Sequence, residues 1–321
     1  MASNIDVTVA VCSRSFSRNP VLRQELLGRY NHVQFNDLGL SLTRDDLVDY
    51  LQGHSHAIVA LEEISAEVIA RLPVLKVISK YGVGTDGLDF QALADRRISL
   101  GWRGGVNKRA VAELVLCFAI GLLRHLPMAQ EMVRGGEWRQ LIGSELYGRT
   151  IGIIGCGHVG KEVGQLFKAM GCEVLAHDIL DFPDYYRTTG VTPVGLEDLL
   201  GKSQIVTLHL PLTTSTRQIL NRERLALMRD DAILINTARG HLVDEEALKF
   251  CLQESCLAAA AFDVFADEPP TDFELLRHPN FLATPHIGGS SEEAVLAMGR
   301  AAIEGLSNAA VPYPGDGRWP E

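Results

Sequence analysis

Short apolar runs alternate with helical patterns along most of the chain, and this alternation constrains the fold more than any other feature. A helix between two strands carries the chain back across the sheet, so the strands it joins run parallel. In the first eighty residues, strand-like runs cover 6–12, 32–36, 56–60 and 75–79, and helical patterns cover 20–30, 43–53 and 65–72. The sequence therefore predicts a parallel sheet with helices on its faces.

A second series of the same kind follows a long helical stretch at 107–126, in which Gly121 is the one weak point. Its strand-like runs lie at 150–154, 173–178, 204–210, 232–236, 258–262 and 281–284, and a final helical stretch covers 290–310. Glycine-rich segments at 101–107 and 285–290 mark two crossings between the halves. We expect an α/β fold with two doubly wound parallel-sheet domains. The first covers 1–104 and is completed by 286–321, and the second covers 105–285.

Composition narrows the classes of partner. The 321 residues carry a formal net charge of −10, which argues against nucleic acid or an acidic membrane surface as a general partner. None of the six cysteines forms a CxxC pair, and no histidine cluster has metal-ligand spacing, so we expect reduced thiols and no metal. The N-terminus has no signal-peptide pattern, and the longest apolar run, 110–123, is too short to span a bilayer. A cytoplasmic protein is expected.

The segment GCGHVG (155–160) is a GxGxxG motif in the context that gives it meaning. It follows an apolar strand, opens a helix that runs to about Met170, and precedes a second strand that ends in Asp178. In a Rossmann domain, Gly155 makes the tight turn, Gly157 lets the backbone approach a pyrophosphate, and Gly160 allows close packing. Asp178 would accept from the adenosine ribose hydroxyls and repel a 2′-phosphate. NAD is therefore expected rather than NADP, and a glycine-rich turn without a ligand is the alternative.

Three further stretches lie just beyond strand ends, where open α/β sheets bind their ligands. They are INTARG, FDVFADEPP and TPHIGG, which contain Arg239, Glu268 and His286. A guanidinium can grip a carboxylate with two hydrogen bonds. An imidazole can exchange a proton near neutral pH, and a neighbouring carboxylate would fix its tautomer. A 2-hydroxy or 2-keto acid needs these three groups.

Each of these side chains also has an ordinary structural interpretation. Arg239 could form an ion pair with Asp244 or Glu245 at a helix start. Glu268 could be a solvated loop carboxylate, and the histidine could be a packed loop residue. Asp263 could simply cap a loop. The placement of all three stretches at strand ends favours the functional interpretation.

The chain resembles the D-isomer-specific 2-hydroxyacid dehydrogenases of the phosphoglycerate-dehydrogenase-like type over nearly its whole length. The stretches that carry the resemblance are SKYGVGTDGLD (79–89), NKRAVAELVL (107–116), ELYGRTIGIIGCGHVGKEV (145–163), HLPLTTSTRQILN (209–221), INTARGHLVDEEAL (235–248), AAFDVFADEPP (260–270) and TPHIGGSSEEA (284–294). The resemblance implies an NAD-dependent oxidoreductase that interconverts a small D-2-hydroxy acid and its 2-keto acid. It also implies a flavodoxin-like substrate domain beside the Rossmann domain, and a homodimer that forms through the NAD domains.

The resemblance also implies roles for single residues. Arg239 would clamp the substrate carboxylate, Glu268 would tune the histidine, and His286 would be the acid/base. The residues implied in cofactor binding are Gly155, Gly157, His158, Val159, Gly160, Asp178, His209, Pro211, Thr216, Thr237, Ala238 and Asp263. Those implied in substrate binding are Tyr81, Gly82, Val83, Gly84 and Asn107, together with Arg239 and His286.

The substrate itself stays open. Arg14, Arg18, Lys80 and Arg103 could bind a second anionic group, or they could be ordinary solvated charges. Because few residues follow the last helical stretch, we expect no appended regulatory domain. One rival is an NAD(H)-sensing corepressor-like binding protein of the same fold. Another is oxidation of formate or phosphite, but formate enzymes of this fold commonly have glutamine in place of Glu268.

Overall fold

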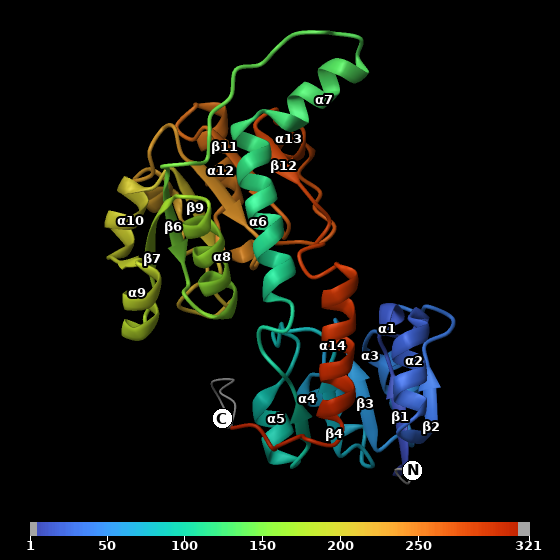
Figure 1. The fold of residues 1–321 in the computed structure, drawn as a ribbon. Coiled ribbons are helices and arrows are strands. Elements are labelled where there is room, and N and C mark those ends of the chain that lie inside the picture. Colours follow the sequence, from blue (N-terminus) through green and yellow to red (C-terminus); the bar gives the residue numbers. More distant parts are fainter. Residues whose placement is uncertain (1–4, 314–321) are drawn as a thin grey trace. The chain divides into compact units, whose positions relative to one another are not determined.

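The computed structural model describes residues 5–313, and its contacts divide the chain into two compact units (Figure 1). Unit 1 consists of Met1–Asn107 and Ser290–Glu321, and unit 2 is Lys108–Gly289. The chain therefore passes between the units twice. The tail over 311–321, whose proline and glycine residues predict an irregular segment, lies largely outside the described residues.

The sheet of unit 1 has five parallel strands in the order β2-β1-β3-β4-β5. These are β1 (Ile5–Val11), β2 (Tyr30–Phe35), β3 (His56–Val59), β4 (Val77–Lys80) and β5 (Ser99–Gly101). This order is that of flavodoxin-like sheets, whose strand order reverses between the first and third strands. The expectation of a flavodoxin-like domain is confirmed.

Helices cover both faces of this sheet, as its apolar strands require. Buried side chains of α1 (Arg14–Arg18), α2 (Pro20–Leu27) and α14 (Glu292–Gly305) pack together on one face. Those of α3 (Arg44–Leu51), α4 (Ala66–Ala70) and α5 (Phe90–Asp95) pack on the other. The Ser79 hydroxyl donates to the carbonyl oxygen of Ala302 over 2.7 Å. The last long helix of the chain thus completes the first domain.

The sheet of unit 2 has seven parallel strands in the order β12-β11-β10-β9-β6-β7-β8. They are β6 (Thr150–Ile154), β7 (Glu173–His177), β8 (Thr192–Pro193), β9 (Ile205–Leu208), β10 (Ile233–Asn236), β11 (Ala259–Phe262) and β12 (Phe281–Ala283). The strand order reverses between β6 and β9, which is the switch point of a Rossmann fold. The prediction of two doubly wound parallel sheets is confirmed.

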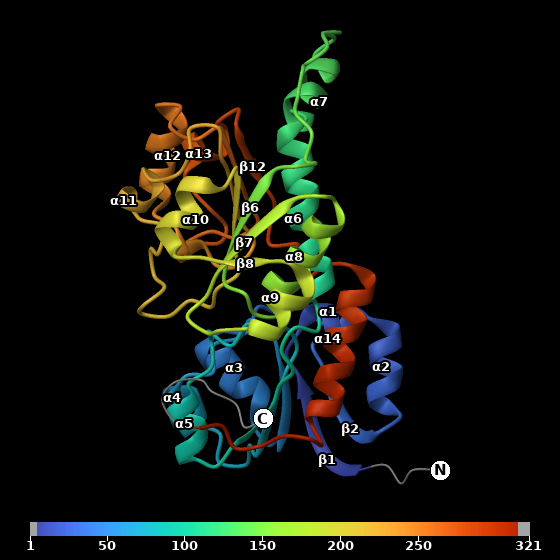
Figure 2. The same cartoon turned by 60° about the vertical axis from the view of Figure 1, so that its left-hand side comes forward.

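Helices also cover both faces of the second sheet. One face carries α6 (Lys108–Leu123), α8 (His158–Ala169) and α9 (Pro183–Thr189), and the other carries α10 (Leu196–Lys202), α11 (Arg222–Leu225), α12 (Glu245–Gln253) and α13 (Phe273–Leu276). Figure 2, turned by 60°, shows the helices on either side of this sheet. The long helix expected to reach residue 126 ends earlier, at Leu123. It continues through Gly121 and breaks at His125, whose φ of 53° is left-handed, before α7 (Leu126–Arg134) begins.

Within residues 5–313, no single helix is long and apolar enough to cross a membrane. Helices α6 and α7 reach that length and composition only as a pair, and the pair is bent by 63°.

Candidate active site

The candidate residues of unit 2 follow the carboxyl ends of its central strands. Because β6, β9, β10, β11 and β12 run parallel and in register, these ends share one edge of the sheet. The glycine motif follows β6, the turn with Arg239 follows β10, and the loops with Glu268 and His286 follow β11 and β12. This edge includes the switch point, where such sheets bind dinucleotides.

The glycine loop has the geometry that a dinucleotide requires. Gly155 has a φ of +97°, and a Cβ there would lie 2.6 Å from the His209 carbonyl oxygen. A Cβ on Gly160 would lie 2.0 Å from the Gly155 carbonyl oxygen, so only glycine permits this helix–strand approach. At Gly157, the N-cap of α8, no described atom lies within 4 Å of the Cβ position. The N-cap of this twelve-residue helix makes no side-chain hydrogen bond, so no capping side chain occupies the first N–H groups, which a pyrophosphate could bind.

Asp178 lies beside this loop. Its Oδ2 accepts the Cys156 N–H over 2.6 Å, and its Oδ1 accepts the Leu180 N–H over 2.9 Å. A carboxylate oxygen has two lone pairs, so each oxygen retains an acceptor site for a ribose hydroxyl. His158 is exposed and Val159 is half-buried at the start of α8.

The loop after β9 holds the next group of candidates. The Thr216 hydroxyl donates to the Pro211 carbonyl over 2.7 Å and accepts the Thr213 N–H over 2.8 Å, which closes the loop on itself. His209 precedes this loop, and its Nε2 lies 3.0 Å from the Thr207 hydroxyl. Desolvation of its ring lowers the pKa of His209 to about 3, so the imidazole is neutral near neutral pH.

A buried asparagine shapes the turn that carries Arg239. The Asn236 side chain is fully buried; its Oδ1 accepts the Ala238 N–H, and its Nδ2 donates to the Arg239 carbonyl over 2.8 Å. The Arg239 guanidinium is half-buried and donates to the carbonyl of Ala238. Thr237 is 9% exposed, and within the described chain its Oγ1 has no hydrogen-bond partner. An orphaned hydroxyl in this turn fits a missing polar ligand such as a nicotinamide.

Gly240 joins this turn to the loop that carries Glu268. A Cβ on Gly240 would lie 1.8 Å from the Phe265 carbonyl carbon and 2.2 Å from the Ala266 nitrogen. The two backbone segments therefore touch at a point where no side chain fits. This contact places the arginine turn directly against the glutamate loop.

Glu268 and His286 are in contact. The Nδ1 of His286 lies 2.9 Å from Oε2 of Glu268, and Oε1 of Glu268 accepts the Phe265 N–H over 3.1 Å. A carboxylate only accepts, so Nδ1 carries the hydrogen and Nε2 is the atom left for a substrate. His286 has a φ of 54°, in the left-handed region that non-glycine residues rarely occupy.

The carboxylate of Asp263 binds the histidine loop. It is 1% exposed and accepts hydrogen bonds from Thr284, Ile287 and Gly288. The ordinary interpretation of Asp263 as a loop cap therefore describes its contacts. Asp244 is the N-cap of α12, where it accepts the Ala247 N–H over 3.0 Å.

The remaining candidates belong to unit 1. Tyr81 is buried, and its hydroxyl accepts from Ser15 over 3.3 Å. Gly82, Val83 and Gly84 follow it, and the Trp102 indole nitrogen donates to the Val83 carbonyl over 3.1 Å. Asn107 is the last residue of the unit's first segment.

The four basic residues considered for a second anion differ in their contacts. Arg103 forms an ion pair with Glu304, with 3.0 Å between Nη2 and Oε2. Lys80 is buried and donates to the Ala60 carbonyl. Arg14 and Arg18 are exposed on α1.

The structure thus brings Arg239, Glu268 and His286 to one edge of one sheet. Sequence reasoning missed Asn236 and Gly240 as the residues that shape this edge, and it considered Glu245 only as an ion-pair partner. Glu245 instead accepts the Ala266 N–H over 2.7 Å. The glycine after the arginine was a usable signal for a close backbone approach, whereas nothing in the sequence marks the partner of Glu245.

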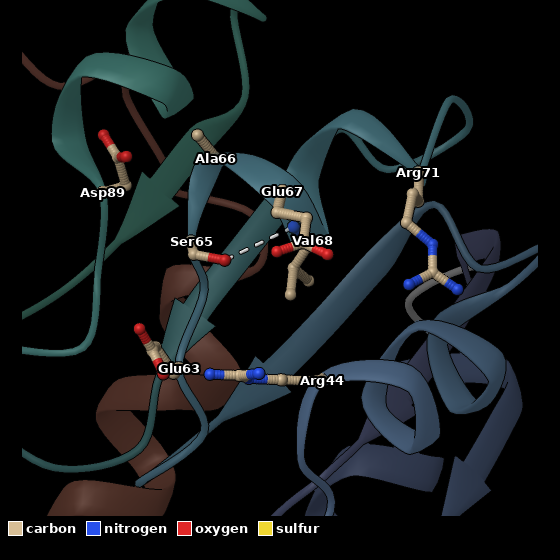
Figure 3. Close-up of a pocket in the computed structure, with 8 residues that line it drawn as sticks. All are labelled: Arg44, Glu63, Ser65, Ala66, Glu67, Val68, Arg71 and Asp89. Atoms are coloured by element: carbon tan, nitrogen blue, oxygen red, sulfur yellow. Dashed lines mark hydrogen bonds between the residues drawn. The ribbon is translucent and has the colours of Figure 1, made fainter.

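A separate hollow of about 340 Å³ lies on unit 1 and contains none of the candidate residues. Figure 3 shows its mixed lining of Arg44, Glu63, Ser65, Ala66, Glu67, Val68, Arg71 and Asp89. The Ser65 hydroxyl caps α4 by accepting the Val68 N–H, and Arg71 pairs with Asp45 outside the group. Its charged side chains are of both signs; those of Arg44, Glu63, Glu67 and Arg71 are exposed, and that of Asp89 is half-buried.

Comparison with known proteins assigns the second unit. Residues 116–288 match the family described as "D-isomer specific 2-hydroxyacid dehydrogenase, NAD binding domain". This span contains the whole glycine motif, all three candidate catalytic residues and every candidate of the loop after β9.

Curated relatives extend the match over most of the chain. D-3-phosphoglycerate dehydrogenase of Methanocaldococcus jannaschii is 36% identical over 84% of this chain and 52% of its own length. Hydroxypyruvate reductase of Thermotoga maritima is 36% identical over 82% of this chain and 87% of its own length. The chain thus spans about half the length of that phosphoglycerate dehydrogenase and most of the reductase.

A solved structure matches nearly all of the chain. The glyoxylate reductase from Paecilomyes thermophila has a TM-score of 0.84 and 25% identity, and the match covers 96% of this chain and 95% of that one.

Proposed function

The chain belongs to the D-isomer-specific 2-hydroxyacid dehydrogenase family, and from this premise we propose that it interconverts a small D-2-hydroxy acid and its 2-keto acid with NAD. The observation that supports the proposal most is the Glu268–His286 contact of 2.9 Å at the strand edge that also bears the NAD-binding glycine loop. An imidazole fixed by a carboxylate beside a dinucleotide site is suited to moving the proton of an alcohol.

The protein's part in this reaction is to bind the acid and handle its proton. The nicotinamide supplies the hydride in reduction and accepts it in oxidation. In reduction, Nε2–H of protonated His286 gives its proton to the carbonyl oxygen at C2. In oxidation, neutral His286 takes the hydroxyl proton at the same atom. Glu268 holds Nδ1–H and stabilises the imidazolium that is present before reduction or after oxidation.

Arg239 is proposed to hold the substrate carboxylate. Its turn is fixed from two sides, by Asn236 within the turn and by the contact of Gly240 with Phe265. A planar guanidinium can form two parallel hydrogen bonds to a carboxylate and thereby orient C2 towards the histidine. The loop from Tyr81 to Gly84 is proposed to supply backbone N–H groups to the same substrate.

The cofactor residues are proposed on the same grounds. Gly155, Gly157 and Gly160 fit a pyrophosphate, and Asp178 retains acceptor sites for ribose hydroxyls. The Thr237 hydroxyl, which has no hydrogen-bond partner within the described chain, fits the nicotinamide end of the cofactor. His158, Val159, His209, Pro211, Thr216, Ala238 and Asp263 complete the proposed cofactor set.

The names of the relatives suggest which acids to try. They include reductases of hydroxypyruvate and glyoxylate and several phosphoglycerate dehydrogenases. The test is NADH oxidation with glyoxylate, hydroxypyruvate, pyruvate, 2-ketoglutarate and phosphohydroxypyruvate. Turnover with at least one acid is expected. Absence of turnover with all five, together with NADH-dependent oligomerisation, would favour the corepressor-like binding protein instead.

Replacing Arg239 with lysine tests the carboxylate clamp. The ammonium keeps the charge but loses the bidentate geometry, so we expect kcat/KM to fall by about 10²-fold or more, while the Kd of NADH changes by less than about threefold. Steady-state kinetics and NADH fluorescence titration measure the two quantities. Unchanged turnover in the lysine variant would refute the clamp.

A homodimer through the NAD domains is also proposed. Helix α7 and the segment after it extend away from the sheet of unit 2 (Figure 2), and none of the described side chains of α7 is buried. Trp138 and Ile142 in that segment are 90% and 94% exposed, and Leu126 and Val133 of α7 are also exposed. Large apolar side chains gathered on a projecting segment are typical of a protein interface.

A further inference from the structure

The side-chain carboxylate of Asp263, the residue that follows β11, is bound by the segment that carries His286. Its Oδ1 accepts from the Thr284 hydroxyl over 2.5 Å and from the Ile287 N–H over 2.7 Å, and its Oδ2 accepts from the Gly288 N–H over 2.7 Å. The carbonyl of Asp263 also accepts the His286 N–H over 2.9 Å. One residue therefore contacts both sides of the histidine along the chain.

The hydrogen bonds to the Asp263 carboxylate are expected to be strong. The Asp263 side chain is almost completely buried, and backbone N–H groups that bind a buried carboxylate form charge-assisted hydrogen bonds. They hold His286 in a left-handed backbone conformation, which costs free energy for a residue with a side chain. Gly288 fits against this carboxylate closely, because a Cβ there would lie 3.0 Å from Oδ2.

Glu245, the first residue of α12, makes the corresponding contact on the other loop. Its Oε1 accepts the Ala266 N–H over 2.7 Å, next to Phe265, whose N–H binds Glu268. Burial raises the pKa of the Glu245 carboxyl, and the Ala266 N–H opposes that rise. The glutamate loop is thus fastened to the helix that follows the arginine turn.

We propose that Asp263 and Glu245 are positioning residues that together set the distance between Glu268 and His286, Asp263 through residues 284–288 and Glu245 through residues 265–268. This inference rests on the proposed acid/base function of His286. It assigns to Asp263 a task in the protein without cofactor, apart from any contact with a nicotinamide. Neither carboxylate would touch the substrate in this role.

The first test is Asp263→Asn in the full-length chain. Ile287 and Gly288 both present N–H donors, and an amide has one oxygen where the carboxylate has two, so one donor must face an NH₂ group. We expect kcat to fall about 10–100-fold, the magnitude usual for a lost orienting partner. Hydrogen–deuterium exchange of the peptide over 284–289, measured without cofactor, should become at least about tenfold faster.

The second test asks whether Glu245 acts by accepting a hydrogen bond or by carrying a negative charge. Glu245→Gln keeps an oxygen for the Ala266 N–H and should stay within about threefold of wild-type kcat, whereas Glu245→Ala should lose about tenfold. Exchange of the peptide over 264–268 should speed up only in the alanine variant. Glu246→Ala is the matched control, since its exposed side chain binds Lys249 and should leave both quantities unchanged.

Hydrogen–deuterium exchange and NADH binding in Asp263→Asn together decide the role of Asp263. Wild-type exchange over 284–289 in Asp263→Asn would overturn the proposal, and a weakened Kd of NADH with that result would make Asp263 a cofactor contact only. If Asp263→Asn does not fold, Thr284→Val removes one donor and should give a smaller change of the same kind. The exchange measurements need no turnover, so they remain informative even if no acid in the substrate panel reacts.

Discussion

Replacing Gly240 with alanine directly perturbs the contact between the arginine turn and the glutamate loop of the candidate site. The new Cβ would lie 1.8 Å from the Phe265 carbonyl carbon, where ordinary contact begins at 3.4 Å. All three of the nearest atoms belong to the backbone of Phe265 and Ala266, so no side chain can rotate away. The arginine turn and the glutamate loop must therefore separate by about 1.6 Å.

Such a separation strains the bonds that hold Glu268. The Phe265 N–H binds Glu268 and the Ala266 N–H binds Glu245, and the collision falls on the peptide group between these two residues. Displacements of about 1 Å near reacting groups can cost 10²-fold in rate. We expect kcat/KM to fall about 10²-fold and the free energy of unfolding to fall by about 1–3 kcal/mol through overpacking.

The assay compares Gly240→Ala with Gly195→Ala. No described atom lies within 4 Å of a Cβ on Gly195, the N-cap of α10, so this control should change stability by less than about 1 kcal/mol and leave kcat/KM intact. Urea unfolding, steady-state kinetics and NADH titration are measured for both. The reasoning is refuted if Gly240→Ala keeps wild-type kcat/KM, because the arginine turn and the glutamate loop would then not need their observed contact.

Three further predictions follow from single side chains. His286→Ala should lower kcat by about 10²–10⁴-fold and remove the acid/base limb from the pH profile of kcat/KM, and a retained wild-type profile would count against its role. His209 has a folded-state pKa of about 3, below the unfolded value near 6.5, so stability should fall as pH drops below about 6.5, by at most about 1.4 kcal/mol per pH unit. Urea unfolding at pH 7 and pH 5 should show a shallower loss in His209→Gln than in wild type; equal losses would contradict the assignment. Trp138→Glu should shift the protein from dimer to monomer in light scattering, whereas Leu38→Glu, at another exposed apolar position, should not; a dimeric Trp138→Glu variant would rule out this interface.

Local patterns predicted the strands well but the helix ends less well. Strand-like runs such as 232–236 are apolar on both faces because a parallel sheet is covered on both sides, and the structure has β10 at Ile233–Asn236. The helix expected over 107–126 stops at Leu123 because the chain turns at His125 in a left-handed conformation. A positive φ at a residue other than glycine leaves no mark in the sequence that spacing rules can detect.

In the candidate site, too, local patterns predicted some features and missed others. The position of a polar residue after a strand predicts the edge of the sheet on which it lies, since parallel strands all end at one edge. Arg239, Glu268 and His286 were found in this way. The partners of Asp263 and Glu245 were not, because a carboxylate at a strand end or in a first helical turn is also the usual loop or helix cap.

By itself, the sequence determined the two parallel sheets, the dinucleotide loop and the strand edge that bears the candidate catalytic residues, because hydrophobic period and glycine spacing are local properties. Only the tertiary structure decided how that edge is assembled. The collision point at Gly240 and the hydrogen bonds of Asp263 and Glu245 join loops about 20–25 residues apart in the chain, and such contacts exist only after the sheet has formed.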